Sequence, residues 1–141
     1  MFSLKKKQQQ DVSGCQVELV KNEAEQLYRS GRMHCAEAVL TAVKNGVRPE
    51  LSDEVVKLAA GFGGGSGAGC ICGAVAGGTM ALGLVLPDDR KRAIRLTKEL
   101  QHWFKQTYSA TCCKLITSEH KGICASLTGN VAGKVAEMVR S

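Results

Sequence analysis

Residues 61–86 read GFGGGSGAGCICGAVAGGTMALGLVL and carry no charged side chain. The first half of this stretch, residues 61–69, is too rich in glycine to form a strongly apolar helix, because glycine is a poor helix former. The second half, from about Cys72 to Leu86, is continuously apolar but shorter than the roughly 20 residues that a bilayer span needs. We therefore expect a flexible loop followed by a buried helix, and no membrane-spanning segment.

One side of this expected helix is nearly free of side chains. Gly73 and Gly77 are four residues apart, as are Ala74 and Gly78, so these small residues lie on one side of a helix. A helix of this composition is intrinsically weak in water. It becomes stable when neighbouring elements pack directly against it, and we expect Gly73, Gly77 and Gly78 to face neighbouring backbone.

The rest of the chain shows helical periodicity. Apolar residues recur at three- and four-residue steps, and no alternating strand pattern of useful length is present. The length of 141 residues, 44% of them hydrophobic, suits one domain with one core. The sequence therefore predicts an all-α fold, a bundle of five to seven helices around a glycine-rich central helix. The other expected helical segments are residues 17–28, 35–43, 51–62, 93–107, 112–116 and 127–139.

The first residues are expected to lie outside the folded domain. We predict a disordered basic lead at residues 1–12 and a single helical, cysteine-rich domain at residues 13–141. No apolar stretch follows the lysines at residues 5–7, as a secretory signal peptide would require, which favours a cytoplasmic protein. The net charge of +6 comes without an aromatic–basic platform or zinc-finger spacing, so we expect neither a nucleic-acid nor a membrane partner.

Cysteine is the residue type that most clearly points to chemistry. In a reducing compartment, so many cysteines do not indicate a framework of structural disulfides, and redox chemistry or ligation of a soft metal is the better interpretation. The three histidines, in contrast, are expected to be surface or hydrogen-bonded polar residues. The seven cysteines are Cys15, Cys35, Cys70, Cys72, Cys112, Cys113 and Cys124.

The glycine-rich loop is not a nucleotide-binding loop. A dinucleotide fingerprint follows a buried strand, and a phosphate-binding loop ends in Gly-Lys-Ser/Thr, whereas this loop ends in Cys70-Ile-Cys72. Cys72 instead lies at a helix start, where unpaired amides and the helix dipole stabilise a thiolate. We therefore expect a depressed pKa for Cys72, with Cys70 as the second candidate.

Three further cysteines are expected to point inward with Cys72. Cys35 and Cys124 share helical faces with apolar residues, and Cys112 shares one with Leu115 and Ile116, while Cys113 is turned about 100° away. The spacing of these cysteines resembles neither a zinc ribbon nor a ferredoxin. The sequence thus predicts that four separate elements bring Cys35, Cys72, Cys112 and Cys124 together.

These residues resemble the C_GCAxxG_C_C family, named for its cysteine pattern. Its central Cys-Gly-Ala-x-x-Gly element matches residues 72–77, and the flanking family cysteines match Cys35, Cys112 and Cys124. The resemblance implies a helical, redox-active protein without a settled reaction. This sequence adds Cys15, Cys70 and Cys113. Because Cys70 and Cys113 neighbour family positions, they compete for the role of the working thiol.

The leading hypothesis is a thiol redox protein that cycles between dithiol and disulfide without a cofactor. Cys72 would attack, and Cys35, Cys112 or Cys124 would resolve the mixed disulfide. Such a protein would act as a thiol–disulfide oxidoreductase or an electron carrier for a partner protein that the sequence does not identify. A homo-oligomer is compatible with the sequence.

Two other hypotheses remain open. In the first, the same four cysteines are metal ligands that hold an iron–sulfur cluster or zinc. In the second, the bundle is purely structural and its buried thiols are inert.

Overall fold

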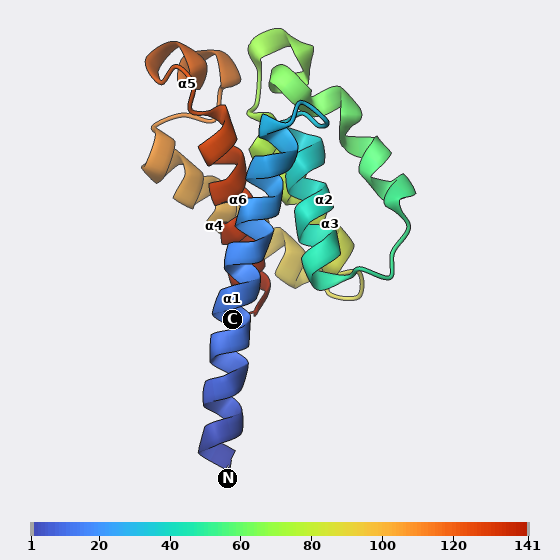
Figure 1. The fold of residues 1–141 in the computed structure, drawn as a ribbon. Coiled ribbons are helices and arrows are strands. Elements are labelled where there is room, and N and C mark those ends of the chain that lie inside the picture. The colour runs from blue at the N-terminus through green and yellow to red at the C-terminus, as the bar shows by residue number, and fades with distance from the viewer. Residues whose placement is uncertain (1, 141) are drawn as a thin grey trace.

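The computed structural model describes the backbone of residues 2–140 and the side chains of residues 14–140. Within these residues the fold is all-α, as predicted, and the helices form a bundle (Figure 1). The only β-type pairing among them is an isolated bridge between Ile71 and Cys112. The elements are α1 (Phe2–Arg29), α2 (Cys35–Val47), the 3₁₀ helix η1 (Asp53–Phe62), the turn segment η2 (Gly65–Gly69), α3 (Gly73–Val85), α4 (Arg90–Tyr108), α5 (Cys113–Glu119) and α6 (Cys124–Arg140).

Helices α1, α2 and α6 pack against one another, and α2 also packs against α3 and η1. Helix α3 contacts α2, α4, α6 and η1. The first turns of α1 extend beyond the rest of the bundle in Figure 1. The disorder expected for residues 1–12 and the domain boundary at residue 13 stay predictions.

The small residues of α3 allow its backbone to approach α2 closely. A Cβ atom added at Gly77 would collide with the carbonyl oxygen of Ala36. One added at Gly73 would collide with the sulfur of Cys35 and lie 2.8 Å from the carbonyl oxygen of Phe62. The expectation that these two glycines face neighbouring backbone is therefore confirmed.

The same expectation is wrong for Gly78. This glycine faces side chains of α4 and α6 instead of backbone. A Cβ atom at Gly78 would lie 3.0–3.2 Å from side-chain atoms of Leu100, Val131 and Val135.

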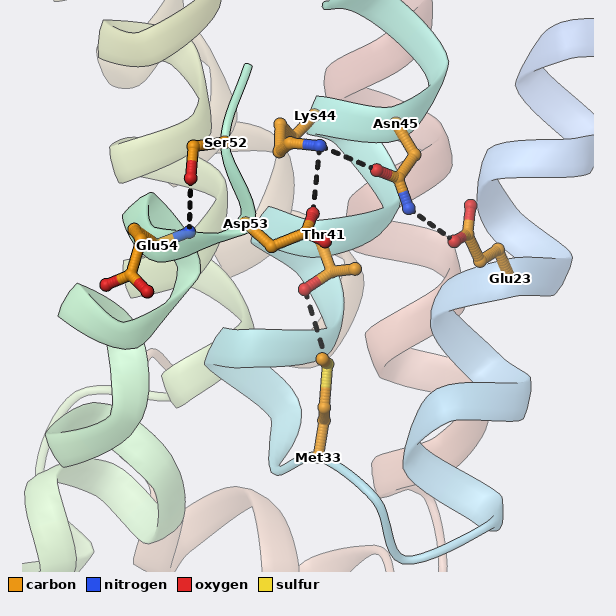
Figure 2. A network of polar contacts seen from close by, with 8 residues as sticks. All are labelled: Glu23, Met33, Thr41, Lys44, Asn45, Ser52, Asp53 and Glu54. Atoms are coloured by element: carbon orange, nitrogen blue, oxygen red, sulfur yellow. Dashed lines mark hydrogen bonds and ion pairs between the residues drawn. The ribbon is translucent and has the colours of Figure 1, made fainter. Parts of the chain in front are cut away.

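The segment after Pro49 is helical, as predicted, although it forms a 3₁₀ helix. Ser52 caps η1, and its Oγ accepts a hydrogen bond of 3.2 Å from the backbone amide of Glu54. The neighbouring Asp53 accepts a bond of 3.1 Å from the Nζ of Lys44, whose side chain is only 3% exposed (Figure 2). This ion pair fastens η1 to the C-terminal end of α2.

The same buried amine also connects α2 to α1. Lys44 donates a second bond of 2.9 Å to the Oδ1 of Asn45, and Asn45 donates through Nδ2 to Glu23 on α1 at 2.8 Å (Figure 2). A buried charge is tolerated only when it is paired and hydrogen-bonded. The network from Glu23 to Asp53 supplies these partners.

No helix in residues 2–140 combines the length and the apolar character that crossing a bilayer requires. The cytoplasmic location stays a prediction.

Candidate functional site

A cavity of about 250 Å³ lies where the N-terminal ends of several helices meet. Four cysteines line it, each from a different helix start. Cys35 is the first residue of α2, Cys72 is the N-cap of α3, Cys113 is the first residue of α5 and Cys124 is the first residue of α6. The cavity therefore gathers thiols from four segments that are far apart in the sequence.

Three of these cysteines, Cys35, Cys72 and Cys124, are ones that the sequence predicted to converge. The fourth lining cysteine is Cys113 instead of Cys112. The sulfur of Cys112 lies 3.2 Å from the carbonyl oxygen of Gly69 and does not line the cavity.

The glycine-rich loop explains the exchange of Cys112 for Cys113. The chain around Thr111 runs alongside the end of the loop: the amide of Cys72 donates to the carbonyl of Thr111 at 2.7 Å, and the amide of Cys113 donates to the carbonyl of Cys70. Cys112 is thereby held in an extended conformation as the N-cap of α5. Successive residues of an extended chain point to opposite sides, so Cys112 and Cys113 diverge.

The prediction that Cys112 points inward assumed that this residue is part of a helix. Cys112 is instead the N-cap, and α5 begins one residue later. Within α5 the inward face passes through Cys113 and Ile116, three residues apart. Ile116 is 2% exposed, whereas Leu115 is 53% exposed.

Burial decides the acidity of Cys72, against the expectation of a depressed pKa. The backbone amides of Ala74 and Val75 hydrogen-bond to its sulfur and lower the pKa, as expected for a helix start. However, the side chain is almost completely buried, and the loss of water disfavours the thiolate more strongly than the amides favour it. The pKa of Cys72 is raised to about 12.

The same balance holds for two other thiols of the cavity. Burial raises the pKa of Cys35, although the amides of Gly64 and Ala36 act in the opposite direction. Burial also raises the pKa of Cys113, and the nearby Cys124 raises it further. Burial thus favours the neutral thiol at Cys35, Cys72 and Cys113.

Four polar residues of the cavity, Tyr28, His34, Thr117 and Thr128, were not predicted from the sequence as part of the site. Burial and the neighbouring Cys124 raise the pKa of Tyr28 to about 12. His34, which we expected to be a surface or polar residue, is exposed yet lines the cavity from the N-cap of α2. Thr128, one turn after Cys124, is 0% exposed. Only the position of His34 next to Cys35 and the four-residue spacing of Thr128 from Cys124 could have indicated them.

The other two cysteines lie away from the cavity. Cys70 and Cys15 are both exposed. All seven cysteines have free thiols in this structure. The role of Cys70 as second candidate stays a prediction.

A larger hollow of about 520 Å³ lies between α4 and α6, and no cysteine lines it. Its lining includes Trp103, with the Nζ of Lys134 lying 5.7 Å from the indole centroid. The thiol cavity, although smaller, therefore holds the reactive groups.

Metal binding would require the thiols to move. Across the described part of the chain, no three side chains of His, Cys, Asp or Glu are close enough together to hold a metal ion. The four cavity sulfurs surround a common space without forming a ready-made set of ligands.

A known protein family matches the part of the chain that contains the cavity cysteines. The family model described as "Putative redox-active protein (C_GCAxxG_C_C)" matches residues 33–138. This range contains the four cavity cysteines and excludes Cys15. No curated protein and no solved structure matched the chain.

Proposed function

The chain belongs to the C_GCAxxG_C_C family, and on this premise we propose that it is a thiol redox protein that cycles between dithiol and disulfide. The observation that carries the proposal is the convergence of Cys35, Cys72, Cys113 and Cys124 on one cavity. The cycle requires an oxidant that contains a disulfide. Two protein thiols lose two protons and two electrons and form one S–S bond, while the oxidant takes up both and is released as two thiols.

Cys35 and Cys72 form the first proposed pair. The sulfur of Cys35 packs against Gly73, the residue next to Cys72. Among the other thiols, Cys35 has the largest effect on the pKa of Cys72, while Cys124 is the thiol that raises the pKa of Cys35, so Cys35 has both as neighbours. A disulfide needs Cα atoms roughly 4.4–6.8 Å apart, which the close packing of α2 on α3 favours.

Cys113 and Cys124 form the second proposed pair. Among the other thiols, Cys124 has the largest effect on the pKa of Cys113. Each of these cysteines is the first residue of its helix. The two helices are neighbours in the sequence, since only residues 120–123 separate α5 from α6. Cys113 thereby takes the place that the sequence analysis gave to Cys112.

The order of attack also follows from burial. A thiolate is the nucleophile in disulfide exchange, and a pKa of about 12 leaves Cys72 almost fully protonated at neutral pH. Cys35 is less buried than Cys72 and is held by the amides of Gly64 and Ala36. We therefore assign the attack to Cys35 and the resolution to Cys72, which reverses the roles expected from the sequence.

The metal-binding hypothesis uses the same four thiols. An iron–sulfur cluster or zinc requires deprotonated sulfurs at bonding distance, and each thiolate–zinc bond is about 2.3 Å long. Burial favours the neutral thiol at Cys35, Cys72 and Cys113, and the described residues contain no ready-made set of three ligands. These properties support dithiol chemistry over metal ligation.

The test uses a variant in which Cys15, Cys70 and Cys112 are replaced by serine, so that only the cavity thiols remain. Purified anaerobically and equilibrated with dithiothreitol at graded ratios of dithiol to disulfide, it should lose and regain thiols in pairs. Metal content should be below one ion per chain. Stoichiometric iron or zinc would overturn the proposal in favour of metal binding, and four thiols that never pair would overturn it in favour of an inert bundle.

A further inference from the structure

The walls of the thiol cavity contain no Asp, Glu, Lys or Arg among the described residues. Apart from the four thiols, the polar groups in its lining come from Tyr28, His34, Thr117 and Thr128. A charged substrate would therefore find no side chain of opposite charge, in contrast to the forked arginine or lysine contacts that bind carboxylates and phosphates elsewhere.

The cavity disfavours charge of either sign. A negative charge inside it loses water and meets no Lys or Arg among the described lining residues, and burial raises the pKa of Cys72 despite two amide donors. A positive charge would face the N-terminal ends of α2, α3 and α6, whose dipoles are positive there. An uncharged molecule avoids both costs.

The size and depth of the cavity limit what can reach the thiols. Its volume of about 250 Å³ lies below the range of roughly 300–1,000 Å³ that is typical of pockets for drug-sized ligands. Cys72 is 6% exposed and Cys35, the proposed nucleophile, is only partly exposed, so the disulfide of a folded protein has poor access to either sulfur. A molecule of a few heavy atoms could enter.

Thr128 adds a polar requirement. Its hydroxyl is buried and has no hydrogen-bond partner among the described residues, although Thr128 lines the cavity one helical turn from Cys124. A buried hydroxyl without a partner destabilises a folded protein. A group in the cavity that donates or accepts a hydrogen bond would remove this cost.

We propose that the oxidising substrate of the cavity is a small, uncharged organic disulfide that carries a hydroxyl or similar group, and that the Thr128 hydroxyl binds this group. The inference rests on the proposed function. One cavity thiolate attacks the substrate disulfide and releases one thiol, and a second cavity thiol displaces the other, so that one S–S bond forms in the protein as one breaks in the substrate. Thr128 is a binding residue and takes no part in the electron transfer.

The experiment compares small disulfides on the reduced variant that keeps only the four cavity cysteines. Bis(2-hydroxyethyl) disulfide is uncharged, cystamine is cationic and dithiodipropionate is anionic. Each second-order rate is divided by the rate of the same disulfide with free dithiothreitol, which removes intrinsic reactivity. We expect the normalised rate of the uncharged disulfide to exceed each charged one by at least about tenfold, and insulin to react more slowly still.

The role of Thr128 is tested with Thr128→Val, which keeps the shape and removes the hydroxyl. The variant should react more slowly with bis(2-hydroxyethyl) disulfide by about five- to tenfold, the typical effect of one hydrogen bond, and unchanged with diethyl disulfide. Its melting temperature in the absence of substrate should be equal or higher, because an unpaired hydroxyl has been removed. A lower melting temperature together with equal slowing on both disulfides would assign a structural role to Thr128.

The outcomes separate the two proposals. If normalised rates are the same for all three charge types, or insulin reacts as fast as the small disulfides, the substrate inference is wrong while dithiol chemistry stands. If no disulfide oxidises the cavity thiols, the proposed function itself is wrong.

Discussion

The sulfur of Cys35 packs against the backbone of Gly73, so closely that residue 73 has no room for a Cβ atom. This contact joins the first residue of α2 to the first residue of α3 and holds Cys35 beside Cys72. Gly73 is therefore needed at this position because a residue with a Cβ atom would keep the two thiols apart.

We predict that Gly73→Ala destabilises the protein and separates this thiol pair. The added methyl group overlaps the sulfur of Cys35 and the carbonyl oxygen of Phe62, which should cost roughly 1–3 kcal/mol in the free energy of unfolding. Chemical denaturation measures the loss, and peptide mapping should show a lower yield of the Cys35–Cys72 disulfide.

Gly83→Ala is the matched control on the same helix. Apart from its chain neighbours and the backbone of its own helix, no atom of the described chain lies within 4 Å of a Cβ at Gly83, so alanine should stabilise α3 by about 0.5–1 kcal/mol through its helical preference. Equal effects of the two substitutions would contradict the packing role of Gly73.

The stability of the reduced protein should fall at alkaline pH because of Cys72. Burial raises its pKa from 9.0 to about 12, so between these values the unfolded chain has lost a proton that the folded chain retains. Unfolding is then favoured by each rise in pH. The contribution is fully present below pH 9 and disappears as the pH approaches 12.

The measurement is denaturation of the wild type and of Cys72→Ala at pH 8 and pH 10.5 under strictly reducing conditions. The wild type should lose more stability between the two pH values than the variant. Parallel losses would show that Cys72 is not the group responsible. Cys70→Ala, at an exposed position, is the control and should follow the wild type.

The ion pair between Lys44 and Asp53 should stabilise the attachment of η1 to α2. Asp53→Asn leaves the buried amine without its carboxylate, but the Asp53 side chain is 89% exposed and water can replace part of the interaction. We expect a loss of about 1 kcal/mol in the free energy of unfolding.

Glu54→Gln is the control for this substitution. Glu54 also lies in the first turn of η1, so both changes remove the same favourable interaction with the helix dipole. Its partner, Lys57, is exposed, and the pair should contribute little. A loss for Glu54→Gln as large as for Asp53→Asn would assign the effect to the dipole.

Helical periodicity and the small-residue pattern were sufficient to predict the fold class and the close approach at Gly73 and Gly77. They identified three cavity cysteines: Cys35 and Cys72 lie at helix starts that the periodicity located, and Cys124 lies in helical phase with the apolar face of the last helix, which begins three residues earlier than expected. They missed Cys113 because the choice between neighbouring residues depends on where α5 begins, and the pairing of the glycine loop with residues 111–113 fixes that start.

The direction of the pKa of Cys72 could not be predicted for a similar reason. The sequence identifies a helix start and hence the amides that stabilise a thiolate. It does not indicate how far surrounding helices exclude water from that sulfur, which decides the balance. Thr128 likewise becomes notable only when its hydroxyl is found buried without a partner among the described residues.

Mass-spectrometric mapping identifies which disulfides form when the reduced wild-type protein is oxidised stepwise with one, then two, equivalents of a small disulfide. We predict that Cys35–Cys72 and Cys113–Cys124 form, while Cys15, Cys70 and Cys112 stay alkylatable. Disulfides that include Cys112 in place of Cys113, or that join only the exposed cysteines, would contradict it.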